Sequence, residues 1–226
     1  MATRSKRYRA AAERRPAAEA VPVPDAVKML KGFAKTRFDE TVELVLRLNI
    51  DSKQSTQNVR GSFSLPHGIG RTVRVIAFAE GDDAQKAAQA GAIEVGSADL
   101  VKKIMDGWMD FDVAVAHPQM MKHVGRLGKV LGPQGKMPSP KSGTVTEDVP
   151  KAVREFRAGK VEFRNDKGGN VQVPVGKRSF EETQLVENVT AMLEHVQGMR
   201  PSGIKGLFIQ AAYLSSTMSP SVKLAV

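Results

Sequence analysis

The chain has 226 residues, of which 34 are Lys or Arg and 24 are Asp or Glu, so its formal net charge is +10. This length is enough for one large domain or two small ones with a real apolar core. A hydrophobic share of 41% and a charged share of 26% exclude a wholly disordered chain. The absence of Cys excludes disulfide bonds and thiolate metal sites. No stretch reaches the roughly 18 apolar residues of a membrane span, so we predict no membrane insertion.

The excess of basic residues is unevenly distributed along the chain. Residues 1–69 contain 13 basic and 7 acidic residues, whereas residues 70–116 contain 5 basic and 8 acidic residues. Residues 117–157 and 158–226 carry net charges of +5 and +2. Excess Lys and Arg attract polyanions and release their condensed counterions on binding. The charge therefore favours a nucleic-acid partner, the alternatives being a merely basic protein and a binder of anionic membrane surfaces.

The first 25 residues are rich in Arg and Ala, which is also typical of mitochondrial transit peptides. Transit peptides avoid acidic residues, and this segment contains Glu13 and Glu19. We therefore interpret it as a basic, partly helical arm. A helix is predicted to follow over residues 26–34, because Pro24 and Asp25 are favourable helix-start residues.

The two ends of the chain have the alternating pattern of half-buried strands. Strands are predicted over residues 42–50 and 62–65. Residues 161–163 and 171–175, joined through "NDKGGN", predict a β-hairpin, and Pro174 predicts an edge strand. Ser179 and Glu182 have the spacing of a capping box before a helix with an apolar face over residues 185–196. Two further strands are predicted over residues 206–216 and 222–226.

Residues 70–157 have a different pattern. Continuous apolar runs at residues 73–78, 92–95 and 112–117 alternate with helical stretches, which is typical of parallel strands covered on both faces. We therefore predict the α/β fold class, with an α+β outer domain. This discontinuous two-layer outer domain (1–69 and 158–226) is interrupted by a small doubly wound parallel-sheet α/β domain (70–157). A hinge is predicted where the chain crosses between the domains, at Pro66, Gly68, Gly70, Arg157 and Gly159.

Motifs for nucleotide and metal chemistry are incomplete. The loop "LGPQGKMPSPKS" (131–142) lacks P-loop spacing, since Met137 stands where the hydroxyl is needed and Pro133 has no N–H. The segment "AEGDDAQKA" supplies one Gly, not a dinucleotide fingerprint. The four histidines (residues 67, 117, 123 and 195) lack zinc-like spacing and an evident carboxylate partner. We therefore predict no enzyme activity, cofactor or metal, and keep a nucleotide-dependent enzyme built on the middle domain as the alternative.

Six blocks occur in order along the chain: "RFDETVEL", "QNVRGSFSLPHGIGR", "DGWMDFDVAVAHP", "LGPQGKMPSPKSGTVT", "VEFRNDKGG" and "SSTMSPSVK". With them the chain resembles the bacterial large-subunit ribosomal protein one family over nearly its whole length. The resemblance implies two domains, the second inserted into the first, in a cytoplasmic protein of the ribosome that is monomeric when free. It also implies three partners: large-subunit ribosomal RNA at the mobile stalk, deacylated tRNA at the neighbouring exit site, and the messenger of its own operon, which it represses.

The resemblance further implies that the outer domain is the principal RNA reader. Arg and Lys would neutralise phosphates, Phe and Met would press against ribose or base, and hydroxyl groups would address 2′-hydroxyls. The positions that match the family are Arg37, Phe38, Thr41, Glu43, Arg47, Lys167, Thr217, Met218 and Ser219.

Two of these positions are unusual. Glu43 repels phosphates, so its expected role is to accept a hydrogen bond from an exocyclic amine or 2′-hydroxyl, or to orient Arg47. The family typically has Gly where this chain has Ser219, which predicts a looser local fit or a small backbone shift. In the inserted domain, Lys129, Lys136 and Lys141 are candidates for a secondary contact with RNA or tRNA, the alternative being simple solvation.

Overall fold

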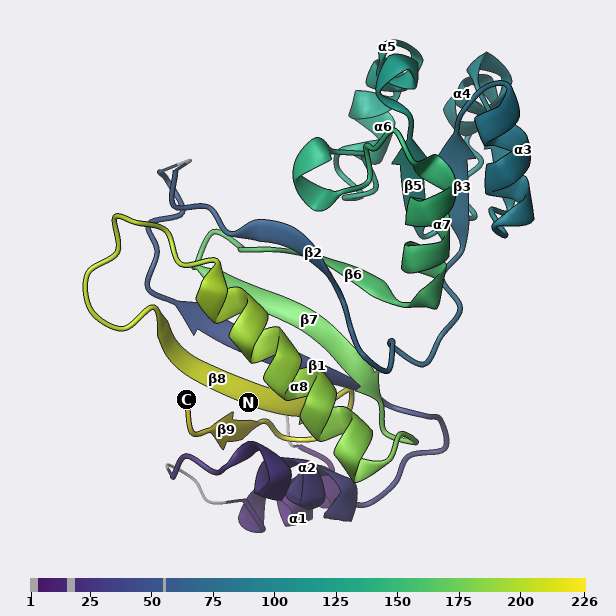
Figure 1. Ribbon diagram of the computed structural model, residues 1–226. Coiled ribbons are helices and arrows are strands. Elements are labelled where there is room, and N and C mark those ends of the chain that lie inside the picture. Colours follow the sequence, from purple (N-terminus) through teal and green to yellow (C-terminus); the bar gives the residue numbers. More distant parts are fainter. Residues whose placement is uncertain (1–3, 16–18, 55) are drawn as a thin grey trace. The chain divides into compact units, whose positions relative to one another are not determined.

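The computed structural model describes residues 4–15, 19–54 and 56–226 (Figure 1). The chain forms two compact units: unit 1 comprises Met1–Gly70 and Val161–Val226, and unit 2 comprises Arg71–Lys160. The chain thus leaves unit 1 after residue 70 and returns after residue 160. The crossings expected from the sequence fall after residues 69 and 157. The predicted α/β fold class is confirmed by separate antiparallel and parallel sheets within one chain.

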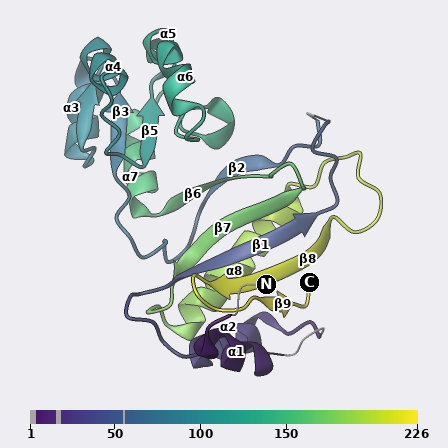
Figure 2. The ribbon, with the colours of Figure 1, turned by 180° about the vertical axis from the view of Figure 1, so that it is seen from behind.

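Unit 1 is built on a four-stranded antiparallel sheet. In spatial order its strands are β7 (Asn170–Lys177), β1 (Thr41–Leu48), β8 (Ile209–Ser216) and β9 (Val222–Leu224). Helices α2 (Val23–Gly32) and α8 (Glu182–Gly198) pack against each other and against this sheet. The even-numbered residues of β1, 42 to 48, are buried, whereas Glu43 and Arg47 are exposed. Figure 2 shows the face of β7, β1 and β8 that lies opposite α8.

The strand after unit 2 takes an unexpected partner. β6 (Lys160–Arg164) pairs with β2 (Arg60–Ser64) in a separate two-stranded sheet, and a single bridge, Asn165 with Val171, joins it to β7. The predicted hairpin is therefore wrong. The Asp166 carboxylate accepts hydrogen bonds from the backbone N–H groups of Gly168 and Asn170, both at 2.8 Å. This turn separates the two strands, and each pairs with a strand from the first part of the chain.

Two local predictions for this part of the chain have opposite outcomes. Pro174 lies in β7 at the edge of the sheet, as predicted, where a missing N–H costs no ladder hydrogen bond. The predicted capping box is wrong by two residues. Glu181 is the N-cap of α8 and exchanges side-chain hydrogen bonds with Gln184. The Ser179 hydroxyl does not cap α8, because it donates a hydrogen bond to Asp39 Oδ2 at 2.7 Å.

Unit 2 is built on a parallel sheet with the strand order β4 (Glu94–Gly96), β3 (Val75–Phe78) and β5 (Val113–Ala116). Ile76, Phe78 and Phe111 belong to a core cluster on one side of this sheet. Val75 and Val115, which alternate with them, are also buried. Both faces are therefore covered, as the continuous apolar runs predicted. The helices of this unit are α3 (Asp82–Gln89), α4 (Ala98–Met105), η1 (Pro118–Met120), α5 (Met121–Val124), η2 (Gly125–Leu127), α6 (Gly128–Leu131), η3 (Pro140–Ser142) and α7 (Val149–Ala158).

Residues 6–13 of the basic arm form helix α1 (Lys6–Glu13), so the predicted helical character is confirmed for these residues. Across the described ranges, no helix combines the length and the apolar composition that crossing a bilayer would require.

Candidate nucleic-acid interface

Strand pairing in unit 1 brings two distant parts of the chain together. β1 and β8 are antiparallel and Val42 pairs with Ser216, so the segment before β1 lies beside the turn after β8. The backbone N–H of Thr217 donates to Thr41 O at 3.1 Å, and the N–H of Thr41 donates to Thr217 Oγ1 at 3.1 Å. Phe38 and Met218, on these two segments, are 53% and 50% exposed. Five predicted site residues therefore meet on one surface: Phe38, Thr41, Thr217, Met218 and Ser219. We call it the apical surface.

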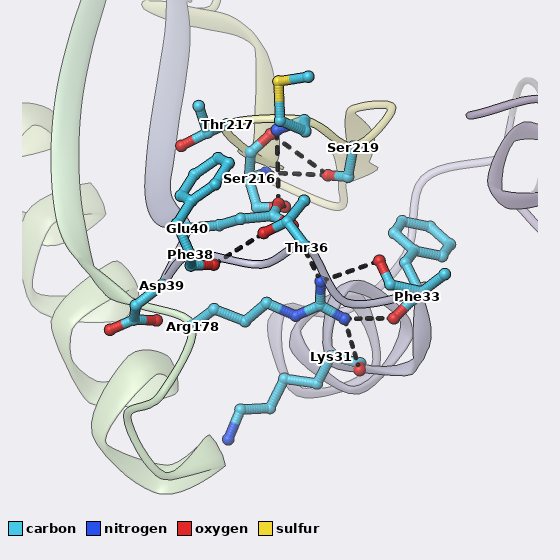
Figure 3. A network of polar contacts seen from close by, with 12 residues as sticks. Lys31, Phe33, Thr36, Phe38, Asp39, Glu40, Arg178, Ser216, Thr217 and Ser219 are labelled. Carbon is cyan, nitrogen blue, oxygen red and sulfur yellow. Dashed lines mark hydrogen bonds and ion pairs between the residues drawn. The ribbon is translucent and has the colours of Figure 1, made fainter. Parts of the chain in front are cut away.

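A buried ion pair lies directly beneath the apical surface (Figure 3). Arg178 Nη1 lies 3.2 Å from Glu40 Oε1, and these residues are only 8% and 1% exposed. The other carboxylate oxygen of Glu40 accepts hydrogen bonds from the Ser216 hydroxyl and, at 3.4 Å, from the backbone N–H of Met218. Glu40 thus joins the segment before β1 to the turn after β8. Sequence reasoning missed this pair, because two charged residues 138 positions apart give no local signal.

Arg178 also holds the end of α2. Its guanidinium donates to the carbonyl groups of Lys31, Phe33 and Ala34, which lie at or just after the C-terminus of that helix. Helix C-termini leave carbonyls without intrahelical partners, and a cation favours this end of the helix dipole. The segment that leads from α2 to Arg37 and Phe38 is therefore fixed before any ligand binds.

The environment of Glu40 lowers its pKa below the ordinary value of 4.5. Burial alone would raise this pKa, but hydrogen bonds from Ser216, Thr36 and the Met218 backbone, together with the charge of Arg178, outweigh it. A carboxyl group whose pKa is lower in the folded state stabilises the fold above its unfolded pKa. That contribution is lost as the pH falls through the lowered folded value.

Ser219 closes the turn of the apical surface. Its hydroxyl accepts a hydrogen bond from Ser216 N at 3.0 Å, and its own N–H donates to Ser216 O at 3.0 Å. Among the described residues only glycines have positive φ, so the turn does not need the conformational freedom of Gly at this position. In the free protein, Ser219 therefore occupies this turn without backbone strain.

Glu43 and Arg47 lie on the exposed face of β1, between the apical surface and the far end of the strand. Four residues along a strand span roughly 13 Å, so the Cα atoms of Glu43 and Arg47 lie well apart on this face. The role of Glu43 in orienting Arg47 stays a prediction. Within the part of the chain that the structure describes, neither side chain forms an ion pair, so both are available to a ligand.

Lys167 lies near the far end of β1, close to where Asn170 pairs with Arg47. It lines an open hollow of about 510 Å³ together with Arg164, Asn165, Asp166, Asn170 and Gln172. Hydrogen bonds, first from the Asn170 backbone, lower the pKa of Asp166 and keep this turn closed. The apical surface and Lys167 thus lie at opposite ends of β1, roughly 23 Å apart along the strand, with Glu43 and Arg47 between them.

A further cation, Lys177, lies beside the apical surface and was missed by sequence reasoning. Its ammonium group donates to Thr41 Oγ1 at 2.9 Å. The register of β7 against β1, which pairs Thr41 with Lys177, brings the two side chains together. A basic residue at a strand end is too common in sequences to be a signal.

The three candidate lysines of unit 2 have different environments. Lys129 on α6 and Lys141 on η3 are exposed. Lys136 donates to Phe111 O at 2.6 Å and to Met109 O at 3.2 Å, and its ammonium lies 4.8 Å from the centre of the Phe111 ring. Lys136 therefore attaches the Pro/Gly loop (131–142) to the rest of unit 2. Lys129 and Lys141 remain as the accessible candidates.

Part of the predicted hinge is attached to unit 1. The buried side chain of Asn188 on α8 accepts from His67 N at 3.1 Å and donates to Gly68 O at 3.0 Å. Gly68 and Gly70 have φ of 63° and 73°, and Pro66 precedes them in the same segment. On the return crossing, Arg157 lies in α7, and Gly159 ends that helix with φ of 114°. Any hinge is therefore confined to the residues next to the two crossings between the units, which lie between residues 70 and 71 and between residues 160 and 161.

The histidines differ from the sequence expectation in one respect. His67 Nε2 lies 2.5 Å from Glu187 Oε2, so His67 does have a carboxylate partner. His195 stacks on Phe63 with ring centres 4.4 Å apart, and burial lowers its pKa, as expected of a packing residue. In the described ranges, no three His, Asp or Glu side chains are arranged to hold a metal ion.

These observations define the class of protein as a two-unit α/β protein in which a parallel-sheet unit interrupts an antiparallel-sheet unit. The sequence model of the "Ribosomal protein L1p/L10e family" matches residues 30–220. The chain belongs to this family. It is therefore a structural protein of the ribosome in the bacterial cytoplasm, and the alternative of a nucleotide-dependent enzyme is excluded.

Relatives from different bacteria match the chain from end to end. The protein named large ribosomal subunit protein uL1 from Rhodopirellula baltica is 56% identical over 225 residues, which is 100% of both chains. Proteins of the same name from Fervidobacterium nodosum and Lactiplantibacillus plantarum are 51% and 50% identical. They match over 99% of this chain and over 96% and 97% of their own lengths.

Proposed function

We propose that the protein binds one segment of large-subunit ribosomal RNA through unit 1, as a structural constituent of the mobile stalk beside the tRNA exit site. The observation that carries this proposal is the buried pair of Glu40 and Arg178, which holds the two halves of the apical surface together. A surface that is ordered before binding loses less conformational entropy when RNA binds. Its half-exposed Phe38 and Met218 suit contact with unstacked bases and ribose.

The residues of the interface have different proposed roles. Phe38 and Met218 touch the RNA, and Arg37, Arg47, Lys167 and Lys177 neutralise phosphates. The Thr217 hydroxyl is already bonded to the Thr41 backbone, so Thr217 acts mainly by positioning Met218. The exposed Glu43 carboxylate accepts a hydrogen bond from an exocyclic amine or a 2′-hydroxyl.

A footprint on purified large-subunit ribosomal RNA tests the proposal. We expect protection confined to one stem-loop region, which an unrelated transcript of equal length fails to compete away at moderate salt. Protection scattered over the whole RNA would instead indicate a purely electrostatic, chaperone-like binder. The absence of protection would contradict RNA binding altogether.

We further propose that the same surface binds the messenger of the protein's own operon and represses its translation. Because one site would read both RNAs, a transcript of the operon should compete with ribosomal RNA, whereas the unrelated transcript should not. Deacylated tRNA is the proposed partner of unit 2, through Lys129 and Lys141. Crosslinking from these two positions on the ribosome would test that contact.

We also propose that the two units reorient about the crossings at 70/71 and 160/161 as deacylated tRNA leaves. Small-angle scattering of the free, monomeric protein should show a distribution of interdomain angles. Scattering that fits one fixed shape would contradict this mobility.

A further inference from the structure

The arm before unit 1's sheet is the most basic short segment of the chain. Residues 4–15 contain six basic residues and one acidic residue, Glu13. Ala11 of α1 is buried, whereas Lys6, Arg9 and Arg14 are exposed. Helical geometry places Lys6 and Arg9 on the face opposite Ala11, and Arg14 follows as the C-cap of the helix. The helix therefore presents a row of cations to solvent, and we call this row the α1 basic face.

Helix stability does not explain Lys6 and Arg9 of the α1 basic face. The first turn contains no acidic residue, although acids there would favour the helix dipole, and it begins with Lys6 and Arg7. Lys6 and Arg9 are also three residues apart, a spacing at which like charges repel. The helix forms nevertheless, with the Ser5 side chain accepting from Tyr8 N at 3.3 Å. Local rules of this kind are most often violated where function requires it.

The arm is held beside the apical surface. Arg15 Nη1, just after α1, donates to Ser221 O at 2.9 Å, and Ser221 lies two residues beyond Ser219. After the arm, Val21 N donates to Lys223 O at 3.0 Å, and Ala225 N donates to Val21 O at 2.9 Å. The arm is thus attached on both sides to residues 221–225, the segment that continues from the apical turn. An RNA on the apical surface would therefore have the cations of α1 within its reach.

We propose that the α1 basic face binds the sugar-phosphate backbone of the same RNA, next to the segment bound by the apical surface. This inference rests on the proposed function and extends its interface. The expected partner is phosphate, because Lys6, Arg9 and Arg14 are cations. Stacking on bases is not expected, because Tyr8, the one aromatic residue of α1, is only partly exposed and lies beneath Arg4. An eight-residue helix is about 12 Å long, enough to face several consecutive phosphates.

The test compares two triple variants of the full chain. In one, Lys6→Gln, Arg9→Gln and Arg14→Gln neutralise the α1 basic face while keeping good helix formers. The matched control removes the same charge from exposed helix positions of unit 2 through Lys86→Gln, Lys102→Gln and Lys151→Gln. Binding to purified large-subunit ribosomal RNA is measured across a salt series, and circular dichroism checks that each variant is folded.

We expect the α1 variant to bind about tenfold or more weakly at 0.1 M salt. The slope of log affinity against log salt should become shallower by about two to three. Its footprint should keep the central protection and lose flanking backbone positions, and the control should resemble the wild type. An unchanged slope, or an equal loss in the control, would overturn the inference.

Three further outcomes distinguish a failure of this inference from a failure of the proposed function and from a membrane role. If the wild type gives no specific footprint, the proposed function itself fails. If the wild type gives one and the α1 variant reproduces it fully, only the role of α1 fails. Loss of binding to anionic phospholipid vesicles with unchanged RNA binding would assign the α1 basic face to a membrane surface and overturn the inference as well.

Discussion

Replacing Arg178 by Met should lower the free energy of unfolding of unit 1 by about 3–5 kcal/mol, because it leaves the Glu40 carboxylate buried without its ionic partner. The same substitution should also leave the carbonyl groups at the C-terminus of α2 without their hydrogen-bond donor. Urea unfolding followed by circular dichroism measures the effect. Trp108 lies in unit 2, so its fluorescence should show a transition that hardly moves.

The Arg60 and Glu162 pair provides the matched control. Its side chains are 33% and 28% exposed, so Arg60→Met should cost only about 0–1 kcal/mol. A double variant, Glu40→Gln with Arg178→Met, should recover part of the lost stability because no buried charge remains unpaired. A cost for Arg178→Met no larger than that for Arg60→Met would contradict a stabilising role for the buried pair.

The acid dependence of stability gives a second measure of the same pair. The pKa of Glu40 is lower than 4.5 in the folded protein, so its contribution is complete above pH 4.5 and is lost as the pH falls below that value. The stability difference between the wild type and Glu40→Gln should therefore narrow on acidification. A difference that stays constant down to acid unfolding would mean that Glu40 is not a charged partner.

Replacing Phe38, Thr217 or Met218 by Ala should weaken binding to the ribosomal RNA segment by about 1–3 kcal/mol each. Phe38 and Met218 would lose apolar contact with the RNA, whereas Thr217 would lose the hydrogen bonds between its hydroxyl and the Thr41 backbone. A filter-binding titration at fixed salt measures the loss. These contacts are not salt bridges, so the salt slope should stay unchanged, in contrast to the α1 variant.

Leu207→Ala is the matched control for these substitutions. Leu207 is an exposed apolar residue of unit 1, 80% accessible, in the loop before β8. The Leu207→Ala variant should bind RNA with wild-type affinity and have the same free energy of unfolding as the wild type. Wild-type affinity for Met218→Ala and Phe38→Ala would remove both residues from the interface. An equal loss for Leu207→Ala would indicate that any exposed apolar residue of unit 1 matters.

The fold was predictable where the pattern is local. The alternation over residues 42–50 identified β1, and the continuous apolar runs of residues 70–157 identified a parallel sheet with two covered faces. The prediction was wrong where strands choose partners. β6 and β7 are separated by a turn that looks like a hairpin loop, but pairing is decided by which neighbouring strand completes a buried face.

The candidate interface shows the same division. The sequence blocks marked Phe38 and Met218 through a family resemblance, and the structure placed them on adjoining segments. No pattern indicated that Glu40 and Arg178 would be buried together beneath them. Lys136 shows the opposite case. A lysine in a Pro/Gly loop is expected to be solvated, yet its ammonium group donates to two backbone carbonyls.

By itself the sequence determined the basic charge, the periodicity of the helices and strands, the interruption of one unit by another, and the family. These properties depend on residue types and short spacings. Only the tertiary structure decided the strand partners, the buried ion pair, and the attachment of α1 beside the apical turn. Such contacts join residues far apart in the chain, and their energies depend on burial and geometry, which no short spacing specifies.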